Sequence, residues 1–78
     1  MNSVEKCILM ALRDRGPMTY FKLAEALRDC GIGTEVFEAM EELVESGKVV
    51  GSLSTPKIFR ITVKGEEAIM ADVLSSLR

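Results

Sequence analysis

Glycine and proline interrupt the apolar pattern of this chain at Gly16-Pro17, between Gly31 and Gly33, and at Gly47. Proline lacks the backbone donor that a helix needs, and glycine favours the positive φ of turns and helix ends. No helix is expected to run through these points. Between them, apolar residues recur at the spacing of amphipathic helices, so the sequence predicts several short helices.

The first two helices are predicted from capping residues and apolar spacing. Asn2 or Ser3 can cap a helix that runs to about Arg15, and Thr19 can cap a second helix over residues 20–29. The apolar residues of the first helix are Val4, Cys7, Ile8, Leu9, Met10, Ala11 and Leu12. One helix face cannot cover all of them, so the first helix is expected to carry surplus apolar surface at Leu9 and Met10.

A third helix is predicted from Thr34 to about Ser46, with Gly47 as its C-cap. Its inward stripe is expected to consist of Val36, Phe37, Met40, Leu43 and Val44. The phenylalanines are assigned to the core, and they are Phe21, Phe37 and Phe59. This leaves Tyr20 as the one aromatic residue expected at the surface.

Two strands are predicted after the third helix. Branched and aromatic residues favour strands over residues 48–53 and 57–62, and Ser54-Thr55-Pro56 supplies the turn between them. Met18-Thr19 is a further short extended piece. The sequence therefore predicts an α+β fold, mostly α, in which a three-helix core is followed by a two-stranded hairpin and an extra C-terminal helix.

The last helix begins after Thr62, which can cap it, and runs to about Leu77. Gly65 in its first turn costs up to about 1 kcal/mol relative to alanine. Its broad apolar face consists of Ile69, Met70, Val73, Leu74 and Leu77. Because contiguous exposed apolar patches are uncommon on monomers, the surplus on the first and last helices predicts a homodimer that forms through them.

A chain of 78 residues fits one domain, residues 1–78, with one core. Its composition, 47% hydrophobic and 28% charged, is that of a globular domain rather than a disordered tail. The longest apolar run, residues 7–12, is too short to span a membrane and lacks the cleavage site of a secretory signal. These features predict a cytoplasmic protein that does not associate with membranes.

The sequence contains no candidate catalytic or metal centre. It has no histidine, which removes the commonest general base and a common metal ligand. Cys7 and Cys30 do not form a CxxC pair, and both are expected to be reduced and mostly buried thiols. Without a nucleophile motif or a glycine-rich phosphate loop, we expect no enzymatic activity and no cofactor.

The order of elements, with two helices joined by a short glycine-bearing turn and then a hairpin, is that of a helix-turn-helix with a wing. The chain resembles the winged-helix transcriptional regulators, and more closely their PadR-like and MarR-like groups. The segment "GTEVFEAMEELVESGKV" is similar to their recognition helix and its exit into the wing. The segment "FRITVKGEEAI" is similar to the second wing strand and the start of a last helix.

The resemblance implies a regulator that binds duplex DNA, with the exposed face of the third helix in the major groove. Positions Thr34, Glu35, Glu38 and Glu42 match that face. This sequence departs from the family there, because relatives commonly place arginine or lysine among these positions. We therefore expect DNA contacts through the wing and the helix N-termini, at Tyr20, Lys22, Thr34, Lys48, Lys57 and Arg60.

Charge is divided unevenly along the chain. Residues 34–46 carry five glutamates and no cation, whereas the whole chain has a net charge of −2. Residues 48–64 carry only cations, which are Lys48, Lys57, Arg60 and Lys64. The hairpin and the third helix are therefore expected to present opposed electric faces.

Alternatives to DNA binding remain open at this point. The glutamates can form an ordinary solvated helix face, in which Glu35 and Glu38 also favour the positive end of the helix dipole. They can also form a docking surface for a basic protein partner, centred on Glu35, Glu38 and Glu42. Dimerisation through the first and last helices is compatible with each of these roles.

Overall fold

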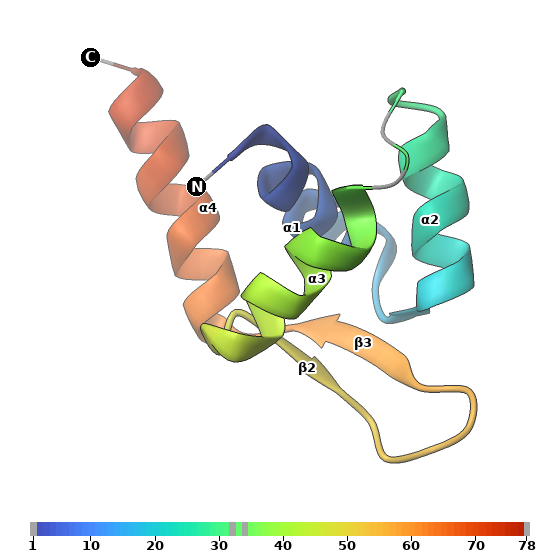
Figure 1. Ribbon diagram of the computed structural model, residues 1–78. Coiled ribbons are helices and arrows are strands. Elements are labelled where there is room, and N and C mark those ends of the chain that lie inside the picture. Colours follow the sequence, from blue (N-terminus) through green and yellow to red (C-terminus); the bar gives the residue numbers. More distant parts are fainter. Residues whose placement is uncertain (1, 32, 34, 78) are drawn as a thin grey trace.

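The computed structural model describes residues 2–31, 33 and 35–77. Within them the chain has an α+β fold, mostly helical, as the sequence predicts (Figure 1). The elements in chain order are α1 (Ser3–Arg15), β1 (Met18–Thr19), α2 (Tyr20–Arg28), α3 (Glu35–Glu45), β2 (Val49–Gly51), β3 (Ile58–Ile61) and α4 (Val63–Ser76). The observed bounds lie close to the predicted ones. The predicted start of the third helix, Thr34, lies outside the described residues.

The helices α1, α2 and α4 begin at capping residues that the sequence predicts. Asn2 and Glu5 form a capping box, in which the Asn2 side chain accepts from the Glu5 backbone N–H at 2.8 Å. Thr19 Oγ1 accepts from the backbone N–H of Lys22 at 3.2 Å and caps α2. Thr62 Oγ1 caps α4 and also donates to the Gly47 carbonyl at 2.7 Å. This last bond ties the end of α3 to the start of α4.

Gly47 ends α3 with a backbone turn that requires positive φ. Its φ is 79°, and its N–H donates to the Val44 carbonyl at 3.1 Å. The next N–H, that of Lys48, reaches back to the Leu43 carbonyl at 2.9 Å. This pair of bonds is a Schellman motif, which reverses the chain and directs it into β2.

The strands form one three-stranded antiparallel sheet in the order β1-β3-β2. Gly51 on β2 and Met18 on β1 both pair with Phe59, from opposite sides of β3. The extended piece at Met18-Thr19 is therefore a strand of the same sheet, a pairing that the sequence did not predict. It brings the start of α2 beside β3.

The core lies between α1 and the elements that surround it, because α1 packs against α2, α3, α4 and β3. The buried cluster consists of Ile8, Leu9, Leu12, Leu23, Leu27, Val36, Ala39, Met40, Leu43, Val49 and Ile69. Leu9 is fully buried and Met10 is half-buried, so the expected apolar surplus on α1 is covered by the chain itself.

The assignment of the phenylalanines to the core is wrong for two of the three. Phe21 is 68% exposed and Phe37 is 58% exposed, whereas Phe59 is half-buried against the core. Val44, also assigned inward, is exposed. Each α-helical residue turns by about 100°, so α3 buries the row that includes Val36 and Met40 and leaves Phe37 beside that row.

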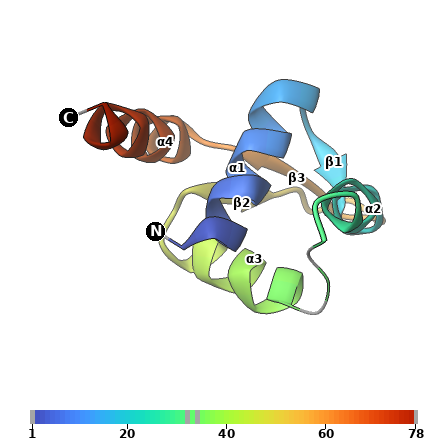
Figure 2. The ribbon, with the colours of Figure 1, turned by 90° about the horizontal axis from the view of Figure 1, so that it is seen from above.

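Gly65 explains how α4 can start against the sheet. A Cβ at this buried position would clash with the Lys48 carbonyl oxygen and approach the Ile61 side chain to 2.7 Å. Only glycine fits there, so the residue that weakens the helix intrinsically is required for its packing. Beyond this contact, α4 extends to one side of the other helices (Figure 2).

Candidate binding surface

The five glutamates of α3, called here the α3 glutamates, are Glu35, Glu38, Glu41, Glu42 and Glu45. All are exposed. The ion pairs among the described residues are Lys6–Asp72 and Arg13–Asp14, so no described lysine or arginine neutralises an α3 glutamate. The negative charge of the α3 glutamates is therefore not balanced by ion pairs among the described residues.

The α3 glutamates lie on two sides of the helix. Glu35, Glu38 and Glu42 line one hollow beside the N-terminal end of α1, which adds Glu5 to the same cluster. The Glu35 side chain also accepts from the Gly33 N–H at 3.2 Å. The structure thus brings together the three carboxylates that the sequence assigns to partner binding.

A second hollow lies on the opposite side of α3, where it faces the start of α2 and the strand β3. We call it the apolar groove, and its apolar lining consists of Tyr20, Phe37, Met40, Val44 and Phe59. Its volume is about 360 Å³, and the rings of Tyr20 and Phe37 meet edge to face with centroids 6.2 Å apart. Glu41 and Glu45 line its α3 side.

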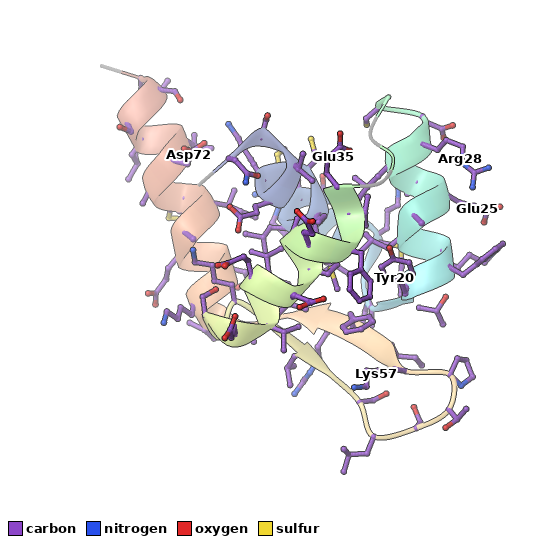
Figure 3. The ribbon with its side chains drawn as sticks, viewed as in Figure 1. Tyr20, Glu25, Arg28, Glu35, Lys57 and Asp72 are labelled. Atoms are coloured by element: carbon purple, nitrogen blue, oxygen red, sulfur yellow. The ribbon has the colours of Figure 1, made fainter. Side chains whose placement is uncertain are left out.

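Lys57 lines the same groove from the hairpin side. Figure 3 labels Tyr20 at the start of α2 and Lys57 on the hairpin. It also labels Glu35, at the N-terminal end of α3. The aliphatic part of Lys57 passes over Gly51, where a Cβ would approach it to 2.8 Å. The apolar groove is therefore polarised, with two glutamates on its helical wall and a lysine on its hairpin wall.

The cations of the hairpin do not form one face. Arg60 lines a different hollow, together with Val50 and Ile58, and it pairs across the sheet with Val50. Successive residues of a strand alternate between the two faces, so Arg60 faces away from Phe59 and Lys57. The expectation of a single cationic face opposed to an acidic one is wrong, because Lys57 shares the groove with Glu41 and Glu45.

The other residues assigned to DNA contact are dispersed. Lys22 lines a hollow on α2 with Arg15 and Glu25. Lys48 is half-buried at the bend between α3 and β2, where its carbonyl accepts from the Thr62 N–H at 3.0 Å. Tyr20 lies in the apolar groove. Thr34 lies outside the described residues.

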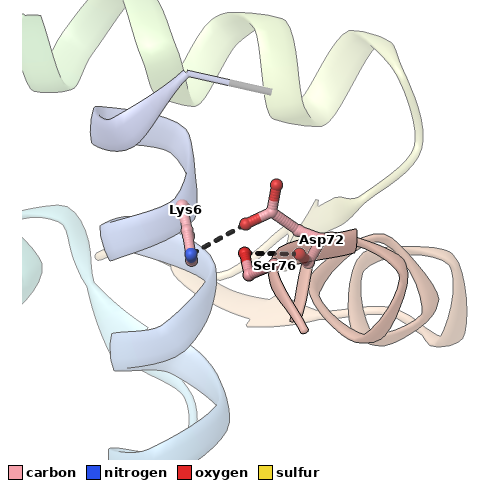
Figure 4. Close-up of polar contacts among 3 residues, drawn as sticks. All are labelled: Lys6, Asp72 and Ser76. Carbon is pink, nitrogen blue, oxygen red and sulfur yellow. Dashed lines mark hydrogen bonds and ion pairs between the residues drawn. The ribbon is translucent and has the colours of Figure 1, made fainter. Parts of the chain in front are cut away.

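An ion pair holds α4 against α1. The Lys6 ammonium lies 2.7 Å from a carboxylate oxygen of Asp72, and Ser76 Oγ donates to the Asp72 carbonyl at 3.0 Å (Figure 4). The hydrogen bond from Lys6, reinforced by its positive charge, lowers the pKa of Asp72 below its usual value of 3.8.

Further findings concern metal ligands, membrane-spanning helices and the two cysteines. Among residues 2–31, 33 and 35–77, no three His, Cys, Asp or Glu side chains are grouped as metal ligands, and no helix is long and apolar enough to cross a membrane. Cys7 is half-buried, as expected, but Cys30 is exposed, because it follows the last turn of α2 rather than lying within it.

Phe37, Val44, Glu41 and Glu45 were not among the site residues predicted from the sequence. The sequence signal for them was the width of the apolar arc on α3, which contains more residues than a single contact with the core can bury.

Comparisons of the chain with protein-family models, with curated proteins and with solved structures find no match. The function of the chain is therefore inferred from the geometry of its surface.

Proposed function

We propose that this chain is a winged-helix protein in which α2 and α3 form the helix-turn-helix pair and the β2-β3 hairpin forms the wing. The order of the elements supports this assignment, and so does the pairing of β1 with the far edge of β3. In this architecture α3 and the wing flank the surface that most often binds a partner macromolecule.

On this framework, the chain is a protein-docking module that uses α3 to bind a basic partner. The observation that carries the proposal is the exposed surface of α3, which has five glutamates, no ion pair between them and a described lysine or arginine, and an apolar groove along one side. Opposite charge speeds encounter with a basic partner and rejects acidic ones, while burial of apolar surface supplies affinity.

The same surface is unfavourable for the DNA major groove. A carboxylate about 4 Å from a phosphate costs on the order of 1 kcal/mol even in water, and several α3 glutamates would approach phosphates together. Among base edges in the major groove, a carboxylate can accept only from the amino groups of cytosine and adenine, and it repels the acceptor atoms of guanine. Apolar side chains such as Phe37 and Val44 would add little to replace the missing cations.

The test compares two labelled probes at about 50 mM salt, a lysine-rich and arginine-rich synthetic peptide and a duplex DNA. Wild-type protein should bind the peptide, and the Glu38→Lys/Glu42→Lys variant should lose that binding. A matched control with the same charge change is Glu66→Lys/Glu67→Lys, which alters exposed positions on α4 and should retain most of it. Undiminished peptide binding by the α3 variant would refute docking through α3.

Duplex DNA binding through the outer side of the wing is the second candidate. It is favoured by the run of residues 48–64, in which Lys48, Lys57, Arg60 and Lys64 occur without an acidic residue. Arg60 is exposed on the sheet face opposite the apolar groove. A regulator of this kind would contact phosphates through the wing and leave α3 free.

Homodimerisation complements either role, and the structure narrows the surface available for it. Leu9 of the first helix is buried, so the proposed dimer uses α4. The large exposed apolar residues of α4 and its C-cap, called here the α4 stripe, are Val63, Met70, Val73, Leu74 and Leu77. Exposed apolar residues at such spacing favour pairing of two helices.

A further inference from the structure

The apolar groove includes exposed apolar side chains that do not belong to the buried core. Phe37 and Val44 are 58% and 43% exposed, and neither belongs to the buried core cluster. Tyr20 is 37% exposed and places its ring against that of Phe37. Three aromatic rings from α2, α3 and β3 therefore surround one opening.

The dimensions of the groove suit a single large side chain. Its volume of about 360 Å³ lies at the lower end of the range for pockets that hold ligands, about 300 to 1,000 Å³. It is continuous with a helix whose exposed residues are mostly carboxylates. An occupant that fills the groove must therefore also place its neighbouring groups against negative charge.

The charges on the two walls restrict the occupant further. Glu41 and Glu45 attract a cation on the α3 side, and Lys57 repels one on the strand side while offering a donor to a backbone carbonyl. A second copy of this chain is a poor fit, because its α4 stripe is flanked by Glu66 and Glu67, whose charge matches that of α3. Nucleic acid is disfavoured by the same carboxylates.

We propose that the apolar groove is the specificity pocket of the docking surface. It takes one large apolar side chain from a basic segment of a partner protein, and a lysine or arginine near that side chain pairs with Glu41 and Glu45. This inference rests on the proposed docking function. It adds that recognition requires an apolar anchor as well as positive charge.

Two synthetic peptides separate the anchor from the charge. The anchor peptide is rich in lysine and arginine with one central tryptophan, and the charge-only peptide has alanine at that position. The protein has no tryptophan, so the emission of the anchor peptide reports only on its own indole. Wild-type protein should bind the anchor peptide at least about tenfold more tightly and shift its emission to the blue.

Variants of groove residues test whether the tighter binding of the anchor peptide depends on the apolar groove. Phe37→Ala should abolish the difference between the two peptides, because it should lower the affinity for the anchor peptide to that for the charge-only peptide. Phe21→Ala is the matched control, because Phe21 is 68% exposed on α2 and does not line the groove. Val44→Ser is a second groove variant, and because both Phe37 and Val44 are exposed, circular dichroism should show intact folding in each.

The outcomes separate the pocket from the docking function. Equal affinity of wild-type protein for the two peptides, or a difference that persists in both groove variants, overturns the pocket. If the charge-only peptide then still loses binding in Glu38→Lys/Glu42→Lys, docking through α3 survives that failure. A preference for the anchor peptide that requires Phe37 but is unaffected by the glutamate variant supports the pocket and refutes the wider role of the acidic helix.

Discussion

Lys57 and Arg60 lie three positions apart in the sequence yet face opposite sides of the sheet. Lys57 lines the apolar groove beside two carboxylates, whereas Arg60 is exposed with Val50 on the outer face. A duplex that contacts one of them through its backbone cannot use the other on the same surface. The hairpin therefore presents less positive charge to DNA than its composition indicates.

The first prediction concerns DNA binding. Wild-type protein should not retard a duplex at about 50 mM salt, whereas Glu38→Lys/Glu42→Lys should bind duplex DNA without sequence preference, because it replaces repulsion with phosphate contacts. The slope of log affinity against log salt, measured by fluorescence anisotropy, should report the added contacts. Strong retardation by wild-type protein would favour the second candidate, and in that case Arg60→Ala should weaken binding more than Lys57→Ala.

The second prediction concerns Gly65. Gly65→Ala should lower the free energy of unfolding by roughly 1 to 3 kcal/mol, because the added Cβ clashes with the Lys48 carbonyl oxygen and crowds Ile61. Gly33→Ala is the matched control, since its Cβ would meet nothing within 4 Å, and its effect should stay within about 1 kcal/mol. Urea denaturation measures both. A Gly65→Ala protein as stable as wild type would contradict the close packing of α4 on the bend before β2.

The helices and strands could be predicted because local signals decide them. Asn2, Thr19 and Thr62 are capping residues next to helical apolar patterns, and Gly47 carries the positive φ that ends α3. These signals act within a few residues, so the sequence displays them directly. The role of Gly65 depends instead on the Lys48 carbonyl, which is distant in sequence. Helix propensity alone shows Gly65 only as a cost to the helix and not as a requirement of its packing.

The candidate site could be predicted only in part. Periodicity shows on which face of a helix a side chain lies, but it does not show whether another element buries that side chain. The acidic character of α3 was evident from composition. Phe37 and Val44 were assigned to the core since they adjoin it on the helix, but the described residues cover them only in part, and they are 58% and 43% exposed. The apolar groove arises where β1 pairs with β3 and brings Tyr20 toward Phe37, a long-range pairing without a local signal.

The third prediction concerns acid stability through Asp72. Because the Lys6 ammonium lowers the folded-state pKa of Asp72 below 3.8, the ion pair stabilises the fold above that pH. Its contribution should be lost as the pH falls through the lowered pKa. Asp72→Asn should therefore reduce the free energy of unfolding slightly at neutral pH, with a difference from wild type that shrinks in strong acid.

Urea denaturation at neutral and strongly acidic pH tests this dependence. Asp29→Asn is the control, because Asp29 is exposed and takes part in no ion pair among the described residues. The difference in free energy of unfolding between Asp29→Asn and wild type should contain no contribution from the ion pair with Lys6. An Asp72→Asn protein with the same stability difference at both pH values would show that the pair does not stabilise α4.

The fourth prediction concerns the α4 stripe. Val63, Met70 and Leu77 recur at intervals of seven residues, with Val73 and Leu74 beside them, and all five are 42% to 77% exposed. Helices with this repeat pack along a continuous seam, and α4 extends beyond the other helices, where a second copy can reach it (Figure 2). Wild-type protein should therefore sediment as a dimer of the 8.6 kDa chain at high concentration.

Met70→Glu/Leu74→Glu should convert that dimer to a monomer without unfolding it, because both side chains are exposed and contribute little to the core. Leu53→Glu is the control, since Leu53 is fully exposed near the hairpin turn, outside α4, and its substitution should leave the dimer intact. Sedimentation velocity over a dilution series measures the dissociation. Wild-type protein that remains monomeric throughout, or a double variant that still dimerises, would show that α4 does not form the contact.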